Sequence, residues 1–396
     1  KTGNNSREEL ASFGDYGYIH YGDIHTRWKG FLDCDIEDTP KIAKKKVENL
    51  PLIKSGDLLI SDASEDYEGI GISTEIKNIG KKKIVGGLHT ILARGDKNKI
   101  INGYGGYIQD LKYYKQEMIR IATGISVYGI SKNNLKKILF PLPPIPEQQA
   151  IVEVLSDVDA LIASLEALIA KKRAIKQGVM QELLTGKRRL PGYSGEWRKN
   201  KLGDFGNFSG GNGFPLRYQG ESTGKYPFYK VSDMNNEGNS IFMTSSNNWI
   251  SEAISKELGD NVFPKNTIVF AKIGAAIYLE RKRMLTQDSF IDNNMMGFIV
   301  DEKKADRKFL YYFLLSIKFG ELVSATALPS LNGTQISNLS FQFPSKNEQS
   351  SITKILSDID DELIVMETKR DKIQDLKQGM VQELLTGRIR LQGGQQ

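Results

Sequence analysis

The sequence is poor in the features that mark secreted, disulfide-linked and membrane proteins. Its 396 residues include a single cysteine, Cys34, so no disulfide can form within the chain. No apolar run approaches the ~18 residues of a membrane-spanning helix, and the first residues lack the basic-then-apolar pattern of a signal peptide. With 39% hydrophobic and 26% charged residues, the composition is ordinary for a globular protein. We therefore expect a soluble cytoplasmic protein of two to four domains.

Motifs of catalysis are also scarce. Methyltransferases that act on base amino groups need an Asn/Asp-Pro-Pro-aromatic stretch to grip the flipped base, but the one Pro-Pro pair here precedes Ile145. Residues 220–225 (GESTGK) are one residue too short for a phosphate-binding loop, and Tyr226 replaces the Ser or Thr that binds Mg²⁺. The sequence therefore predicts no catalytic centre of these two classes and no cofactor.

Metal chemistry has only weak support. The three histidines stand without cysteines or paired acids, which argues against a metal site; they are His20, His25 and His89. Asp62 followed by Glu75 and Lys77 has the order of carboxylates and lysine found in nucleases, although such a triple arises easily by chance in a charged chain. A stand-alone nuclease that uses these three residues stays open as an alternative.

The positive charge lies in two parts of the chain. The net charge is +6. Residues 1–139 carry 22 basic and 18 acidic groups, a surplus of +4, and residues 191–340 carry 17 and 15, a surplus of +2. This distribution favours a polyanionic partner, although the charge is small.

One stretch of the sequence occurs twice. Residues 140–190 and 341–391 align without gaps at an offset of 201, and 22 of their 51 positions are identical. The identities cluster at an opening Glu-Gln pair, at Leu-Ser-Asp-x-Asp, and at a closing Lys-Gln-Gly…Gln-Glu-Leu-Leu-Thr-Gly. An internal repeat of this kind sets the architecture, so the chain consists of two related halves.

Each copy opens with a proline-containing segment and then becomes helical. In the first copy Pro146 is the last proline, which predicts a helix from Glu147. Apolar residues then follow at spacings of four and three, the period of a coiled coil; they are Ile151, Leu155, Val158, Ile162, Leu165 and Ile169. Thr-Gly pairs at 185–186 and 386–387 predict the helix ends. About 39 residues make each helix about 58 Å long.

A helix of this length needs a partner for its apolar stripe. If a pseudo-twofold axis relates the two halves, the helices pair with each other as an antiparallel coiled coil. The alternative is that each helix packs separately into its own domain.

The segments between the helical copies repeat more faintly. At an offset of 210, residues 18–24 (YIHYGDI) correspond to 228–234 (FYKVSDM), while the intervening sequence has diverged. Short β-rich runs alternate with turns rich in Gly and Asn, and residues 307–323 have a helical pattern. We therefore predict an α+β fold in which two globular domains are separated by the two long helices.

The predicted order is domain, helix, domain, helix, with boundaries at 1–139, 140–190, 191–340 and 341–396. The last segment includes a polar tail from Gly393. The second domain opens with a lead at residues 197–205, whose counterpart at the same offset would fall before residue 1. We expect the first domain to lack this lead.

The repeated motifs resemble those of the specificity (S) subunits of type I restriction–modification systems, over almost the whole chain. The resemblance implies two target recognition domains, each of which reads one half of a split sequence in double-stranded DNA. It implies that the two helices hold these domains at a fixed separation. It also implies a non-catalytic DNA-binding subunit of a prokaryotic restriction and DNA-methylation complex, with two methyltransferase (M) subunits on the helices and restriction/translocase (R) subunits recruited to the assembly.

Two sets of candidate residues follow. Residues of the repeated motifs are expected to form helix or subunit interfaces: Glu147, Gln148, Leu155, Leu165, Glu348, Gln349, Leu356 and Leu363. Basic residues and one glutamine near predicted turns are candidates for DNA contact, since Arg and Gln read bases and Lys suits phosphates: Arg27, Lys77, Lys81, Lys82, Lys83, Arg217, Lys230, Lys272, Arg281, Lys282, Arg283 and Gln287. Arg281–Arg283 is predicted to top a hairpin. A solvated basic loop is the alternative for each.

The leading hypothesis is therefore a DNA-recognition scaffold. The stand-alone nuclease is the second hypothesis. The third is a coiled-coil adaptor whose globular ends bind proteins.

Overall fold

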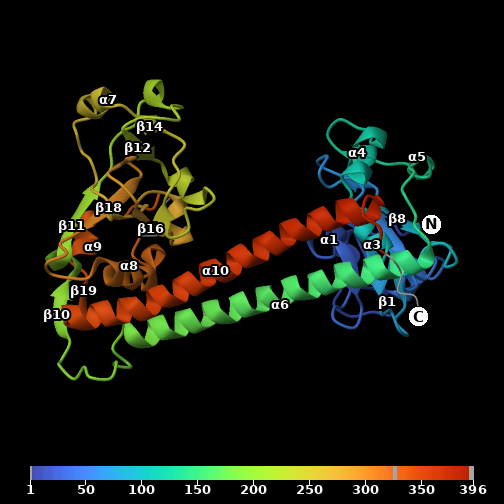
Figure 1. Ribbon diagram of the computed structural model, residues 1–396, viewed down its shortest axis with the longest axis horizontal. Coiled ribbons are helices and arrows are strands. Elements are labelled where there is room, and N and C mark those ends of the chain that lie inside the picture. The colour runs from blue at the N-terminus through green and yellow to red at the C-terminus, as the bar shows by residue number, and fades with distance from the viewer. Residues whose placement is uncertain (1, 324–327, 392–396) are drawn as a thin grey trace. The chain divides into compact units, whose positions relative to one another are not determined.

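The computed structural model describes residues 2–323 and 328–391, and the chain divides into two compact units (Figure 1). The first unit holds the residues up to Ala167 and those from Glu367 onward, and the second unit is Leu168–Met366. Each unit therefore combines one globular part with a portion of both long helices. The expected polar tail at 393–396 lies outside the described residues.

Two larger sheets and one two-stranded sheet, β5-β9, form the globular part of the first unit in the part of the chain that the structure describes. One has the order β3-β1-β7 with β1 and β7 parallel, and the other has the order β2-β6-β4-β8 with β4 antiparallel to both neighbours. The strands are β1 (Tyr16–Ile19), β2 (Gly30–Asp33), β3 (Lys41–Ile42), β4 (Leu58–Ser61), β5 (Ala63–Ser64), β6 (Ser73–Lys77), β7 (Ile84–Gly86), β8 (Thr90–Ala93) and β9 (Tyr128–Gly129). The helices are η1 (Arg7–Glu9), α1 (Tyr21–Thr26), α2 (Lys44–Val47), α3 (Gly105–Ile108), α4 (Lys112–Ile121) and α5 (Lys132–Leu135).

The globular part of the second unit has sheets of order β14-β12-β17, β11-β18-β15-β16-β13 and β10-β19. Its strands are β10 (Arg198–Lys201), β11 (Gly206–Gly210), β12 (Tyr226–Tyr229), β13 (Phe242–Met243), β14 (Trp249–Ile250), β15 (Ile268–Ala271), β16 (Lys282–Leu285), β17 (Phe290–Ile291), β18 (Met295–Val300) and β19 (Ser340–Phe343). Its helices are η2 (Leu202–Phe205), η3 (Leu216–Tyr218), η4 (Val231–Asn235), α7 (Glu252–Glu257), η5 (Ala275–Leu279), α8 (Arg307–Ser316), η6 (Phe319–Glu321) and α9 (Gly333–Ser337).

The two globular parts share one strand framework. β12 pairs in parallel with β17 as β1 does with β7, and β15 is antiparallel to β16 and β18 as β4 is to β6 and β8. The outer strands also correspond, since β13 runs parallel to β16 as β2 does to β6. The α+β fold and the internal repeat are therefore confirmed in each unit.

The lead of the second domain, at residues 197–205, and the strand β11 that follows it complete the sheets of this domain. β10 pairs with β19, and β11 pairs with the outer edge of β18, while Leu202 and Phe205 between them are buried. In the first domain, β8 occupies the place of β18 and has no strand on its outer edge among the described residues. A cavity of about 560 Å³ beside β8 is lined by apolar side chains that include Ile138, Phe140 and Leu142.

The two long helices are α6 (Ile145–Leu183), green in Figure 1, and α10 (Lys346–Leu385), red. α6 begins two residues before the predicted start, because a proline is tolerated in the first turn, where its missing N–H has no helical partner. Gly186 and Gly387 follow the helix ends, both with a φ of 72°, the left-handed conformation that glycine adopts without strain.

Within each unit the helices pack against each other in antiparallel directions. In the first unit Ile151 and Leu155 of α6 share an apolar cluster with Val381 and Leu384 of α10. In the second unit Ile169 packs with Ile359 and Leu363. The alternative of two separately packed helices is therefore wrong. No helix among the described residues is long and apolar enough to span a membrane.

Candidate nucleic-acid interface

The repeated motifs form matching contacts in the two units. Glu147, at the start of α6, accepts two hydrogen bonds from Arg390, at 2.6 Å from Nε and 2.5 Å from Nη2. In the second unit Glu348 accepts the same pair from Arg189, at 2.6 and 2.8 Å. The arginine holds the pKa of Glu147 below its ordinary value. Each bidentate pair ties the first turn of one helix to the segment that follows the other.

The glutamines next to these glutamates join each helix to its globular part. Gln148 donates to the carbonyl of Lys99 at 2.7 Å and accepts from the N–H of Ile101 at 3.1 Å. Gln349 accepts from the N–H of Asp306 at 2.8 Å. Both side chains are buried, so these bonds satisfy polar groups that water cannot reach.

A three-residue cluster completes each junction. Tyr107 donates to Asp159 at 2.8 Å, and Asp159 also pairs with Lys377 of the other helix at 2.6 Å. In the second unit Tyr312 donates to Asp360 at 2.6 Å, and Asp360 pairs with Lys176 at 2.5 Å. We name these the first and the second Tyr–Asp–Lys clamp.

The eight predicted interface residues therefore lie inside the units. The four glutamates and glutamines make the contacts above, while Leu155 and Leu356 are fully buried and Leu165 and Leu363 nearly so. The repeated motif thus serves to hold a globular part on the helix pair. Whether these residues also affect a partner subunit stays a prediction.

Matching hydrogen bonds define one edge of each globular part, which we call the C-terminal strand edge. It lies where β1, β4 and β7 end in the first domain and where β12, β15 and β17 end in the second. The N–H of Asp62 donates to the carbonyl of His89 at 3.1 Å, and the N–H of Lys272 donates to that of Asn294 at 2.8 Å. The backbone is therefore equivalent at this edge, while the side chains differ.

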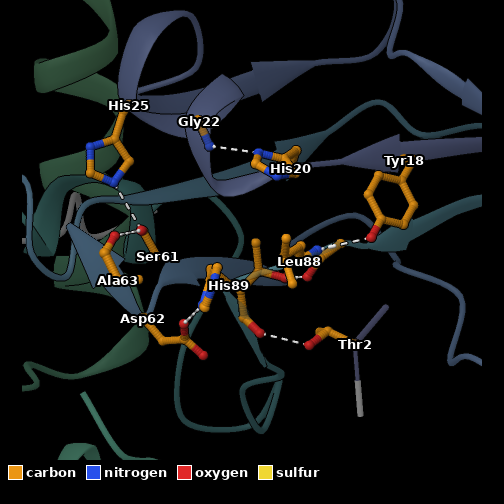
Figure 2. Close-up of polar contacts among 12 residues, drawn as sticks. Thr2, Tyr18, His20, Gly22, His25, Ser61, Asp62, Ala63, Leu88 and His89 are labelled. Atoms are coloured by element: carbon orange, nitrogen blue, oxygen red, sulfur yellow. Dashed lines mark hydrogen bonds and ion pairs between the residues drawn. The ribbon is translucent and has the colours of Figure 1, made fainter. Parts of the chain in front are cut away.

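In the first domain this edge carries the histidines (Figure 2). His89 is exposed and lies 3.2 Å from the carboxylate of Asp62, while His25 Nε2 lies 2.8 Å from the hydroxyl of Ser61. His20 accepts a hydrogen bond from the N–H of Gly22 at 3.1 Å and caps α1. Burial lowers the pKa of both His20 and His25 and so favours the neutral imidazoles.

In the second domain the same edge carries cations. Lys230, the counterpart of His20, donates to the side chain of Gln219 at 3.0 Å. Lys272 and Arg281 lie at the end of β15 and the start of β16, and Arg281 donates to Asn235. Three of the predicted DNA-contact residues are thus brought to one edge.

Other predicted residues gather at the opposite edge. Lys81, Lys82 and Lys83 are exposed in the turn between β6 and β7, in a hollow that Lys41 and Lys44 also line. Gln287 lies in the matching turn between β16 and β17 and is exposed. The predicted set is therefore divided between two edges, and the residues of one edge do not meet those of the other.

Three predicted residues stack on aromatic rings. Arg27 lies 4.7 Å from the ring of Trp28 and Arg217 lies 4.6 Å from that of Tyr218, and both are exposed. Lys77 lies 3.6 Å from the ring of Phe31, in a hollow beside the first clamp. Lys77 therefore lies beside the part of the helix pair that carries Asp159 and Lys377.

The segment Arg281–Arg283 does not top a hairpin. Lys282 and Arg283 lie within β16, and the connection from β15 is the segment before Arg281. Lys282 is fully buried, donates to Glu280 at 2.5 Å and to the carbonyl of Ile317 at 2.9 Å, and has a pKa lowered by burial. Its ammonium joins Glu280 to the carbonyl of Ile317 inside the protein, so it is not available to a phosphate. Arg283, half-buried, donates to the carbonyl of Asn239.

The residues of the nuclease alternative do not converge. Glu75 is buried and accepts hydrogen bonds from the N–H of Gly103, which precedes α3, and from the N–H of Gly106 in α3, and burial raises the pKa of Glu75. Asp62 lies beyond the end of β4 and contacts His89 instead. Among residues 2–323 and 328–391, no group of three or more His, Cys, Asp or Glu side chains is placed to hold a metal ion.

The sequence reasoning missed the first domain's histidine edge. The sequence does contain a signal for this edge, because the offset of 210 aligns His20 with Lys230, one of the predicted DNA-contact residues. His89 and Asn294 could not be matched this way, since the offset falls to 205 after the turn between the strands.

Comparisons with known proteins agree with this geometry. A family model described as the type I restriction modification DNA specificity domain matches twice, at residues 5–174 and 194–375. The MjaVIII type I restriction enzyme specificity subunit of Methanocaldococcus jannaschii is 24% identical over 331 residues, which is 79% of this chain and 76% of that protein. The MjaIX specificity subunit from the same organism is 22% identical over 404 residues, covering 97% and 86%. The crystal structure of the type I restriction–modification S subunit from M. genitalium has a similar fold, with a TM-score of 0.55, 16% identity and coverage of 97% and 92%.

Proposed function

Because this chain belongs to the type I restriction modification DNA specificity domain family, we propose that its two globular parts each read one half of a split DNA sequence. The chain is a specificity subunit, the non-catalytic DNA-recognition component of a type I restriction–modification complex. Its family membership supports this reading over a stand-alone nuclease or a protein-binding adaptor. What remains to be assigned is how the reading is divided within the chain.

One observation supports two separate readers. The backbone hydrogen bonds at the C-terminal strand edge are the same in both domains, whereas His20, Asp62 and His89 of the first are replaced by Lys230, Lys272 and Asn294 in the second. A shared framework that presents imidazoles in one copy and ammonium groups in the other fits two different half-sites, because base edges are distinguished by donors and acceptors. We assign base or phosphate contact to Lys230, Lys272 and Arg281 at this edge.

The exposed lysines at the opposite edge, Lys81 to Lys83, are proposed to contact the phosphate backbone. Four further residues remain candidates for DNA contact, apart from the group Lys230, Lys272 and Arg281 and the group Lys81 to Lys83: Arg27, Arg217, Arg283 and Gln287. Phosphate contacts position a protein without reading sequence, so Lys81 to Lys83 would add affinity to any DNA.

The partners follow from the duplication. A chain that repeats a surface binds two copies of one partner through equivalent contacts. We propose that two methyltransferase subunits dock, one on each half of the helix pair, and that restriction/translocase subunits join this assembly. The site of action is then the prokaryotic cytoplasm, in association with DNA.

Methylation mapping tests the proposed function. In cells that carry this chain with its methyltransferase subunit, long-read sequencing should reveal one split methylated motif with a spacer of constant length. Deleting the gene for this chain should remove the motif, and the gene returned should restore it. A continuous motif, or methylation that survives the deletion, would contradict the proposal.

A further inference from the structure

All three histidines of the chain surround one tyrosine at the C-terminal strand edge of the first domain. The ring of Tyr21 lies 4.6 Å from that of His20, 5.8 Å from His25 and 5.4 Å from His89, measured between ring centroids. The contacts to His25 and His89 are edge-on, at 85°. Tyr21 and His25 are half-buried and His89 is exposed, so the cluster is open to a ligand on one side.

Resting on the proposed function, we propose that this histidine–tyrosine cluster is the DNA contact of the first domain, and that imidazole protonation makes first half-site recognition strengthen as the pH falls. The matched edge of the second domain has Lys230, Lys272 and Asn294 in the places of His20, Asp62 and His89. Lysine stays charged and asparagine stays neutral from pH 6 to 8. Recognition of the second half-site is therefore independent of pH over this range.

The charged groups around each imidazole bear on whether DNA binding strengthens or weakens as the pH falls. Arg7 and Asp23 lie near His20, and Arg7 bonds Asp23 at 2.8 Å. Asp66 lies near His25, and Asp62 lies beside His89. Among residues 2–323 and 328–391, the basic groups that act on His20 are Arg7 and His89, and the charged group that acts on His25 is the carboxylate of Asp66.

A phosphate or a guanine acceptor placed here adds negative potential and favours the protonated form. A histidine with a higher pKa in the complex than in the free protein takes up a proton on binding. Its contribution to affinity is therefore gained as the pH falls through the pKa of the complex and is lost as the pH rises. Tyr21 adds a flat ring on which a base or sugar can stack.

The chemistry also suits a selective contact. A neutral imidazole offers one donor and one acceptor, whereas the protonated ring offers two donors. Hydrogen bonds to a charged group are shorter and stronger than neutral ones. We therefore expect the preference for the first half-site, as well as its affinity, to depend on pH.

The test selects binding sites from a library of randomised 40-base-pair duplexes, with the full chain in its methyltransferase complex, at pH 6 and at pH 8. We expect enrichment of one half-site to be roughly three- to ten-fold higher at pH 6, since one unit of pKa change corresponds to a ten-fold factor. Enrichment of the other half-site should stay constant. Equal responses of both half-sites, or no response in either, would overturn the proposal. If no sequence is enriched at either pH, the proposed function itself fails.

Variants connect the response to the cluster. His89→Asn introduces the residue of the matched position, and asparagine tolerates the φ of 54° found there. His25→Gln keeps a hydrogen-bonding group toward Ser61. The double variant, which keeps only His20 of the three imidazoles, should lose most of the pH response of one half-site while its thermal unfolding stays as in the parent. The matched control, Lys272→Gln, should weaken the other half-site equally at both pH values. A double variant that is folded and keeps the full pH response would overturn the assignment.

Discussion

The second Tyr–Asp–Lys clamp should be a major source of stability for its unit. Asp360→Asn removes the charge of a side chain that is only 8% exposed and that pairs with Lys176 at 2.5 Å. Removing one partner of a buried ion pair costs about 3–5 kcal/mol when the remaining charge stays buried. Lys176 keeps 18% exposure and an amide can still accept from Tyr312, so we expect a loss of about 2–3 kcal/mol. For a unit of this size, that loss lowers Tm by roughly 5–10 °C.

The first clamp supplies a matched control with the same chemistry and less burial. The Asp159 side chain is 36% exposed and that of Lys377 is 21% exposed. Solvent screens such a pair, so Asp159→Asn should cost only about 1 kcal/mol. Calorimetry gives the total effect, and hydrogen exchange of α8 and α3 assigns it to a unit. Equal losses in the two variants, or a larger loss for Asp159→Asn, would refute the reasoning from burial.

Four further predictions follow from the same structure. Lys282→Ala should destabilise the second unit by roughly 3 kcal/mol, because it leaves the partly buried Glu280 without its cationic partner and the carbonyl of Ile317 without its donor; chemical denaturation measures this, and a change confined to DNA affinity would contradict it. Arg281→Ala should leave stability within about 0.5 kcal/mol and weaken the second half-site, which binding to single-base variants tests. Glu147→Gln should remove part of the stability at pH 7, and the loss should shrink as the pH is lowered, because the depressed pKa of Glu147 stabilises the folded chain above the unfolded pKa and this contribution is lost as the pH falls through the folded pKa; denaturant unfolding of the parent and the variant over a pH series measures this. Inserting two heptads near Ala170 and Asp371 adds about 21 Å of helix and should lengthen the preferred spacer by about six base pairs; an unchanged spacer in a folded variant would show that the helices do not set it.

The repeated parts of the molecule could be predicted well from the sequence, because a pattern that occurs in both copies is checked by its second occurrence. The seam residues Ile151, Leu155 and Ile169 are buried as expected, and the glycines at 186 and 387 follow the helix ends. The repeat marks the Glu-Gln pair as a motif but does not indicate which residues it contacts. Arg390 and Ile101 lie far from it in sequence, and only the packed helices bring them together.

The candidate site was predicted less well, since a basic residue in a divergent loop has no sequence signal for burial. Lys282 reads like its neighbours Arg281 and Arg283, yet strand β16 alternates between faces and turns it into the core. The histidine cluster as a whole has no sequence signal, because its three histidines are separated along the chain and only the fold brings them to Tyr21. Tyr21 and His89 are 68 residues apart, and the parallel pairing of β1 with β7 brings their chain segments to one edge.

Replacing one globular part tests the two-reader account most directly. Residues 198–339, which include β10, would be exchanged for the second recognition domain of another specificity subunit, while β19 and both long helices keep their sequences. Long-read sequencing of cells that carry the hybrid with its methyltransferase subunit then gives the methylated motif. The account predicts that one half of the motif changes while the other half and the spacer length stay the same. A motif in which both halves change together would contradict it.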